Sequence, residues 1–362
     1  MRLSFFLLVA SLLALATALQ ECDSFKTCDT CANGTNWMGV NCNWCTTANT
    51  CGHFFINTCP MSRRVGFAYN CPRWLPRGVV YNDKFAREKI YPLIAEAYDE
   101  DRNRRQQILN CHFKKVIVGN VYETPCDFFA RTSCYAYTVV LPTEKAIVVS
   151  FRGSNGIEQL VQQGVNFFVT KSMKTFPPTG GLIYDYYYNA FYGLWNSGLK
   201  RDLTQYVRQY PDYEFWSVGH SLGGGLASLT AASVVSNRLR PWTKVKMVSF
   251  GQPRIGDMSF AAGYDRVVPF SFRIINRNDP VPSIPVLQPL GSPLPGPFHH
   301  RHLVWYPDGM PTGAKYYVNY MAEDRSGYSG QIQLNVADHM TYFGKNFANW
   351  PSTAKRCPTV RQ

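Results

Sequence analysis

The chain has 362 residues, of which 46% are hydrophobic, and this is enough for a hydrophobic core. Its 37 Lys and Arg outnumber its 24 Asp and Glu, which gives a formal net charge of +13. The basic residues are scattered, apart from a small group at 102–105, so we expect no nucleic-acid partner. Scattered positive charge is compatible with a soluble cationic protein or with adsorption on anionic lipid surfaces.

The first 18 residues have the pattern of a secretory signal peptide. Arg2 precedes an apolar stretch from Phe5 to Leu15, and residues 16–18 form a small-residue cleavage site. A membrane anchor is disfavoured because the apolar stretch is short and ends in that site. No later stretch is apolar for long enough to span a membrane, and the C-terminus carries no retention signal or lipid anchor. We therefore expect a secreted, extracellular protein that begins near Leu19.

The 12 cysteines are unevenly distributed. Eight lie between Cys22 and Cys71, and disulfides persist outside the cytosol. We predict a disulfide-rich module at 19–72, a linker at 73–83 and a larger domain at 84–362. The two C-x-x-C pairs of the module are also compatible with zinc, but eight cysteines in an exported chain favour disulfides.

The cysteine spacing, with Asn43-Trp44-Cys45 at its centre, resembles the cysteine-rich module of plexins, semaphorins and integrins. The resemblance covers only this region and implies an accessory or spacer role without chemistry. Asn33-Gly34-Thr35 is an N-glycosylation sequon, which predicts a glycan at Asn33.

The larger domain is predicted to begin with an amphipathic helix from Asp83, kinked at Pro92, and the charged stretch 99–107 to be an exposed loop. Cys126 and Cys134 are close enough in sequence to pair, which leaves Cys111 and Cys357 as a hypothetical pair joining the two ends of the domain. Strands are expected at 116–118, 135–141, 146–151, 215–218, 244–250, 267–275 and 302–306, and a long helix at 193–209. Strands that alternate with helices predict an α/β fold with a largely parallel sheet.

The segment Gly219-His220-Ser221-Leu222-Gly223 lies between a predicted strand and an Ala/Leu-rich helical stretch. Its glycines allow a sharp turn that exposes the Ser221 hydroxyl, and the helix N-terminus favours a developing oxyanion. The motif alone is common, and a glycine-rich turn with an incidental serine is the alternative. The strand–turn–helix context favours a nucleophilic Ser221.

A serine nucleophile needs a base and an acid that orients the base. Asp279 follows a predicted strand on a Pro-rich loop, where α/β sheets place their sites, although a loop-capping role is equally compatible. His339 lies near the end of the domain, where the last member of a triad is expected. The other candidate acids and bases are Asp257, Asp265, Asp308, Asp324, Asp338, His299, His300 and His302. The His-His-x-His pattern lacks a nearby carboxylate or cysteine, so we expect no metal site.

Together these segments resemble the class 3 lipases, a family of secreted fungal triacylglycerol lipases, over roughly residues 84–350. The matching motifs are Phe151-Arg152-Gly153-Ser154, Gly219 to Gly224, Phe250 to Gly256, Asn278 to Pro282, His300 to Tyr306 and Asp338 to Phe343. The resemblance implies an α/β-hydrolase fold that acts through Ser221, Asp279 and His339, without a metal or cofactor. It also implies an oxyanion hole formed by the Leu222 N–H and by Ser154.

In this family a short helical lid follows the oxyanion residue. The corresponding segment here carries an apolar stripe of Ile157, Leu160 and Val161, which is also typical of an ordinary core helix. The stretch 188–191 departs from the family at a position beside the expected pocket, which bears on acyl-chain preference. The aromatic run 184–192 either lines that pocket or packs in the core.

We therefore predict a secreted carboxylic-ester hydrolase that acts on acylglycerols or other small esters, with peripheral contact at lipid interfaces. The alternatives are a phospholipase A1, a soluble short-chain or feruloyl-type esterase, and a non-catalytic binding protein in which the cysteine-rich module is the functional part. The complete set of triad residues disfavours the last alternative.

Overall fold

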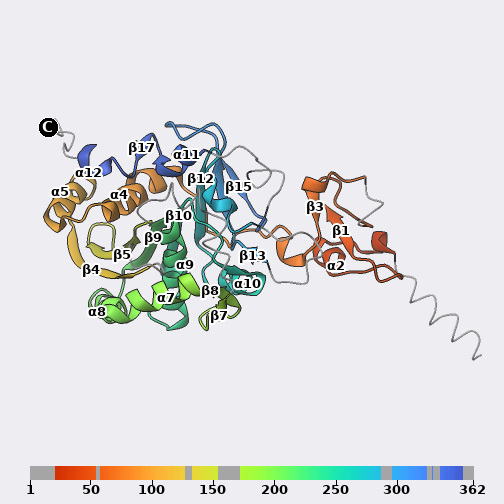
Figure 1. Ribbon diagram of the computed structural model, residues 1–362, viewed down its shortest axis with the longest axis horizontal. Helices are drawn as coiled ribbons and strands as arrows, with labels where there is room; N and C mark the ends of the chain where they lie inside the picture. Colours follow the sequence, from red (N-terminus) through yellow and green to blue (C-terminus); the bar gives the residue numbers. More distant parts are fainter. Residues whose placement is uncertain are drawn as a thin grey trace, which may run out of the picture. The chain divides into compact units, whose positions relative to one another are not determined.

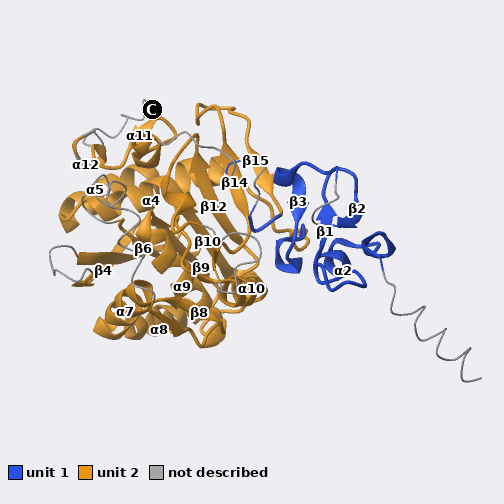
Figure 2. Cartoon of the chain, turned by 45° about the vertical axis from the view of Figure 1, so that its right-hand side comes forward, with its two compact units in different colours: residues 1–73, 321–330 blue, residues 74–320, 331–362 orange. Residues whose placement is uncertain are grey.

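The computed structural model describes residues 21–53, 58–126, 133–153, 172–286, 296–323, 328 and 335–353. The chain divides into two compact units, residues 1–73 with 321–330 and residues 74–320 with 331–362 (Figure 2). The sequence did not lead us to expect 321–330 in the first unit. The expected signal peptide lies outside the described residues. No helix in the described ranges combines the length and apolar character needed to cross a membrane.

The first unit is built around a three-stranded antiparallel sheet in the order β2-β1-β3. Its elements are η1 (Cys22–Ser24), α2 (Cys28–Ala32), β1 (Cys42–Cys45), β2 (Thr50–His53), η2 (Met61–Arg63), β3 (Arg64–Val65) and η3 (Ala68–Asn70). Its disulfides are Cys22–Cys42, Cys28–Cys71, Cys31–Cys51 and Cys45–Cys59. All four cysteines of the C-x-x-C pairs are therefore in disulfides rather than available to zinc. Asn33 is exposed just after α2, and its glycan stays a prediction, as does the resemblance of this module.

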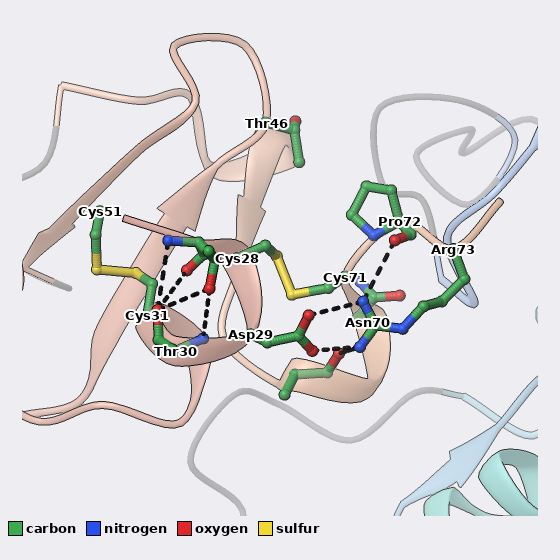
Figure 3. Close-up of a disulfide and its surroundings, with 12 residues drawn as sticks. Cys28, Asp29, Thr30, Cys31, Thr46, Cys51, Asn70, Cys71, Pro72 and Arg73 are labelled. Atoms are coloured by element: carbon green, nitrogen blue, oxygen red, sulfur yellow. Dashed lines mark hydrogen bonds and ion pairs between the residues drawn. A yellow bond between two sulfur atoms is a disulfide. The ribbon is translucent and has the colours of Figure 1, made fainter. Parts of the chain in front are cut away.

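Polar contacts supplement the disulfides of the first unit. Asp29 and Arg73 form an ion pair beside the Cys28–Cys71 bridge (Figure 3). The Asn70 amide holds the backbone of Glu323, accepting from its N–H at 2.6 Å and donating to its carbonyl at 2.7 Å. The Asn70 side chain thus binds the backbone of the distant residue Glu323 with the same pair of hydrogen bonds that a neighbouring strand would make.

The second unit contains an eight-stranded sheet in the order β15-β14-β12-β10-β9-β6-β5-β4. The central strands β6, β9, β10, β12 and β14 are parallel, and the strands outside them are antiparallel. The bounds are β4 (Ile117–Pro125), β5 (Ser133–Leu141), β6 (Ala146–Phe151), β9 (Glu214–His220), β10 (Val245–Phe250), β12 (Ser271–Asn276), β14 (Leu303–Tyr306) and β15 (Tyr317–Asn319). The predicted α/β fold with a largely parallel sheet is confirmed.

Helices cover both faces of this sheet (Figure 1). On one face lie α7 (Asp185–Leu194), η6 (Trp195–Leu199), α8 (Lys200–Gln209), α9 (Leu222–Ser236) and α10 (Met258–Val267). On the other lie α3 (Asp83–Phe85), η4 (Ala86–Ile90), α4 (Tyr91–Ala95), η5 (Glu96–Tyr98), α5 (Arg102–His112), α11 (Val336–Met340) and α12 (Trp350–Thr353). Smaller elements are β7 (Met173–Thr175), β8 (Leu182–Tyr184), β11 (Gly256–Asp257), β13 (Pro297–Phe298), β16 (Thr341–Tyr342), β17 (Lys345–Asn346), η7 (Trp242–Lys244) and η8 (Val281–Ser283).

The exposed loop predicted at 99–107 is wrong, because α5 begins at Arg102. The Asp101 carboxylate caps this helix by accepting from the N–H groups of Asn103 and Arg104. Arg105 is fully buried, and its guanidinium donates to the Glu96 carbonyl at 3.1 Å and to the Tyr135 hydroxyl at 2.6 Å. Asp99 and Arg105 are therefore buried with polar partners, while Glu100, Asp101 and Arg102 remain exposed on the surface.

Two further predictions compare with the structure as follows. The predicted helix at 193–209 corresponds to a longer helical run from Asp185, bent at Gly198, whose φ is 127°. Cys126 and Cys134 form the expected disulfide. Cys111 is also disulfide-bonded, and Cys357 lies outside the described residues.

Candidate active site

Ser221 lies in the sharp turn between β9 and α9. Its backbone has φ 57° and ψ −131°, a conformation that a non-glycine residue adopts only when the surrounding structure enforces it. A Cβ on Gly219 would come within 2.3 Å of the Gly223 carbonyl oxygen, and one on Gly223 within 2.4 Å of the Arg152 carbonyl oxygen. The flanking glycines therefore allow the close packing that holds Ser221 in place.

Backbone groups surround the Ser221 side chain. Leu222 is the first residue of α9, so its N–H lies outside the hydrogen-bond ladder of the helix. The β6 end lies close by, since a Cβ on Gly153 would be 2.9 Å from the Ser221 Cβ. Ser154, the other expected oxyanion donor, lies outside the described residues, as do the expected lid residues Ile157, Leu160 and Val161.

Asp279 and His339 form a fully buried pair. His339 Nδ1 is 2.9 Å from each carboxylate oxygen of Asp279 and must be the donor, because an ionised carboxylate only accepts. The carboxylate also accepts from the Tyr342 hydroxyl at 2.8 Å and from the Val281 N–H at 2.9 Å. These contacts fix the tautomer that leaves His339 Nε2 with its lone pair.

The loops that carry this pair are hydrogen-bonded to each other. The Asn335 N–H donates to the Asn278 carbonyl at 3.2 Å, and the Asn278 N–H donates to the Asp338 carboxylate at 3.3 Å. The Asn276 amide donates to the carbonyls of Asp338 and Thr341, at 3.3 and 2.8 Å. The loop after β12 that carries Asp279 and the helix α11 that carries His339 therefore form one hydrogen-bonded unit.

Gly251, at the end of β10, leaves the space that this pair occupies. Its φ is 57°, and a Cβ there would lie 2.7 Å from Asp279 Oδ2 and 2.7 Å from the His339 ring. Gly251 was part of a motif but not a candidate site residue. A glycine directly after a buried parallel strand was the available signal.

His220, the residue before Ser221, contacts His339. The ring centroids of His220 and His339 are 4.5 Å apart, and His220 Nε2 is 2.8 Å from the His339 carbonyl oxygen. Ser221, Asp279 and His339 thus come together at the carboxyl ends of β9, β10 and β12. Ser221 Oγ and His339 Nε2 are buried without a hydrogen-bond partner among the described residues, and they are not bonded to each other. Each is therefore available for a proton transfer.

Comparison with known proteins identifies the family. The profile of the family described as lipase (class 3) matches residues 148–288. Lipase ZK262.3 of Caenorhabditis elegans is 32% identical over 294 residues, which span 74% of this chain and 81% of that protein. The chain belongs to the class 3 lipases.

Two further similar proteins have lower sequence identity to this chain. Secreted mono- and diacylglycerol lipase 3 of Gibberella zeae is 26% identical over 204 residues, which span 53% of this lipase and 62% of that protein. The crystal structure of a lipase from Rhizopus microsporus var. chinensis matches with a TM-score of 0.61 at 19% identity, covering 76% of this chain and 96% of that one. The lipase therefore has the α/β-hydrolase fold, and membership of the family implies lipid esters as its substrates.

The other acidic candidates of this lipase have contacts elsewhere. Asp257 caps α10, and Asp265 pairs with Arg301. Asp338 joins the two loops described above, Asp308 accepts through its backbone from Arg277, and Asp324 lies outside the described residues.

The alternative histidines are buried away from Ser221. His299 Nε2 donates to the Pro282 carbonyl, and His300 contacts Ser228 and Gln252 at 3.0 Å. Burial holds the pKa of His299 and of His300 well below the usual range. His302 is likewise buried. In the described part of the chain, no cluster of His, Cys, Asp and Glu is suited to hold a metal ion.

Part of the aromatic run of the lipase belongs to the core. Tyr187 and Phe191 on α7 are buried, and a Cβ on Gly225 would lie 2.4 Å from the Tyr187 ring. Tyr187 therefore packs directly against α9, the helix that follows the nucleophile elbow. The effect of the 188–191 departure on acyl-chain preference stays a prediction.

Proposed function

We propose that this lipase is secreted and hydrolyses the carboxylic esters of acylglycerols through Ser221, His339 and Asp279. The observation that carries the proposal is the buried Asp279–His339 pair beside the Ser221 elbow, with Ser221 Oγ and His339 Nε2 both unengaged among the described residues. The disulfides and the secreted relative in Gibberella zeae support export from the cell.

In the proposed mechanism, His339 Nε2 takes the proton as Ser221 Oγ attacks the ester carbonyl. Asp279, already bonded to His339 Nδ1, stabilises the imidazolium that forms. The Leu222 N–H at the start of α9 and Ser154 stabilise the oxyanion. His339 then protonates the leaving alcohol, and water hydrolyses the acyl-enzyme by the same steps in reverse order. The residues themselves supply all the proton transfers, so the reaction requires no metal or cofactor.

The test is hydrolysis of p-nitrophenyl esters from acetate to palmitate, and of emulsified triacylglycerol, by wild type and by Ser221→Ala. We expect Ser221→Ala to lower kcat by at least about 10⁴-fold, because the nucleophile of a triad cannot be replaced by its partners. The matched control is Ser236→Ala at the exposed end of the same helix, which should retain wild-type kcat.

The substrate profile distinguishes the alternatives. Preference for long-chain emulsified substrate supports a lipase, preference for short soluble esters supports an esterase, and release of fatty acid from phospholipid supports a phospholipase A1. Wild-type activity that survives Ser221→Ala would contradict the proposed triad. A wild type inert on every ester and phospholipid would favour a binding protein.

A further inference from the structure

A chain of hydrogen bonds lies beneath the proposed catalytic residues and connects three segments that are far apart in sequence. The Gly153 N–H donates to the Tyr98 hydroxyl oxygen at 3.2 Å, and that hydroxyl is 2.5 Å from His220 Nδ1. His220 Nε2 is 2.8 Å from the carbonyl oxygen of His339. The chain therefore joins the end of β6, the nucleophile elbow and the backbone of the proposed base.

The direction of each hydrogen bond follows from the groups involved. The His339 carbonyl only accepts, so His220 Nε2 must carry a proton. Burial, together with the nearby His339, holds the pKa of His220 well below its usual range, so the ring is neutral and Nδ1 must accept. Burial raises the pKa of Tyr98, which therefore keeps its proton and donates it to Nδ1. Only the Nε2–H tautomer of His220 satisfies both neighbours.

Aromatic rings enclose this arrangement. Phe347 stacks on Tyr98 with ring centroids 5.6 Å apart and an interplanar angle of 20°, and its centroid is 4.4 Å from that of His220. The rings of Tyr342 and His220 form a T-shaped pair with their centroids 5.9 Å apart. His220 is fully buried, so its ring cannot replace a lost partner by turning toward solvent.

We propose that Tyr98 and His220 are positioning residues: Tyr98 holds the His220 ring by donating to its Nδ1, and the ring in turn holds the His339 backbone in the position that aims the His339 side chain at Ser221. The same chain keeps Gly153 beside the nucleophile. This inference rests on the proposed function of Ser221 and His339, because it concerns how their geometry is maintained.

Removing the Tyr98 hydroxyl should loosen this chain of hydrogen bonds. The buried Nδ1 atom would lose its donor and the Gly153 N–H its acceptor, while His220 Nε2 would still donate to the His339 carbonyl. With Nδ1 unpaired, the His220 ring is held less firmly, and the His339 backbone that it binds should shift with it. The loss should appear in kcat rather than in KM, because neither proposed positioning residue contacts the substrate.

The test compares Tyr98→Phe with Tyr91→Phe on a soluble ester. Tyr91 belongs to the same aromatic cluster, and its buried hydroxyl has no hydrogen-bond partner among the described residues. We expect Tyr98→Phe to lower kcat about tenfold with KM unchanged, and Tyr91→Phe to change neither. In a double-mutant cycle, Tyr98→Phe should add little to His220→Phe, because both remove the same connection.

A second readout does not depend on activity. The ¹⁵N shifts of His220 should report the Nε2–H tautomer in all three proteins, and the shift of the unprotonated Nδ1 should change in Tyr98→Phe, where that atom loses its donor, but not in Tyr91→Phe. Equal kcat values for the two tyrosine variants, or an Nδ1–H tautomer in wild type, would overturn the inference. Failure of the proposed function is distinct, because it would appear as full activity of Ser221→Ala whatever the state of His220.

Discussion

The two units of the chain are stabilised by different means. Among the described residues of the first unit, the main cluster of buried hydrophobic side chains consists of five cysteines together with Trp44 and Val65. The second unit has a core of aliphatic and aromatic side chains that extends across the eight-stranded sheet. A small unit buries too little apolar surface to be stable without cross-links, whereas the larger one also tolerates a strained Ser221 and fully buried polar groups.

If the larger unit depends on close non-covalent packing, adding one methyl group beside Asp279 and His339 should lower activity more than any other change considered below. Gly251→Ala should lower kcat on a soluble ester by about 10³-fold, because the new Cβ would displace Asp279 and the His339 ring. Steady-state kinetics would measure the loss of activity, and thermal unfolding would show whether the variant is still folded. Gly344→Ala is the control, since Gly344 also has a positive φ, of 73°, but its added methyl group would meet no atom within 4 Å. Equal kcat values for the two variants would show that the space at Gly251 is unimportant.

If the smaller unit depends on its cross-links, removing one should destabilise that unit without stopping hydrolysis. Cys28→Ser with Cys71→Ser opens a bridge between residues 43 positions apart and should cost the first unit about 3 kcal/mol in its free energy of unfolding. Calorimetry and limited proteolysis would locate the loss, and kcat on a soluble ester should not change.

The matching change in the larger unit is Cys126→Ser with Cys134→Ser, which opens a bridge between residues 8 positions apart. Its loss should be smaller, because a shorter loop restricts the unfolded chain less. The reverse order of the two losses would contradict the contrast between the units.

A buried carboxyl gives the larger unit a pH dependence that cross-links would not. Glu96 is fully buried, accepts from Trp350 Nε1 at 2.6 Å, and has its pKa raised by burial from 4.5 to about 8. The folded protein therefore holds the Glu96 proton more tightly than the unfolded chain does, so protonation of Glu96 stabilises the fold. This stabilisation is complete below pH 4.5 and is lost as the pH rises through 8.

Glu96→Gln should remove this dependence. We expect the variant to have nearly the free energy of unfolding of wild type at pH 5 and to exceed it by about 5 kcal/mol near pH 9. Denaturant unfolding at both pH values would measure the difference, with the exposed Glu123→Gln as the control. Parallel pH profiles for wild type and Glu96→Gln would show that Glu96 is not the responsible group.

The parts that the sequence predicted are those encoded locally. The β9–elbow–α9 unit is one continuous segment, so its glycines, its apolar strand and its helix could be recognised together. Asp279 and His339 were identified by their order along the chain and by motif, and the structure brings them into contact.

The parts that were missed depend on partners distant in sequence. The helix α5 was mistaken for a loop because its charges looked like solvent-facing ones, whereas Arg105 binds a backbone carbonyl and Tyr135 in the interior. The connection from Tyr98 to His220 spans 122 positions, and no local pattern indicates it. The attachment of 321–330 to the first unit was hidden for the same reason, because its contact with Asn70 is visible only after folding.

The split composition of the first unit also constrains how such a chain can be inherited. Its two stretches meet at Asn70 and Glu323, which are 253 positions apart in sequence. A single crossover between genes near residue 73 would transfer the cysteines but not the distant segment that Asn70 holds. The chain that receives the cysteines would then have a first unit without the stretch that contains Glu323. The chain that loses them would keep that stretch without the cysteine-rich module. A complete first unit therefore needs both stretches from the same source.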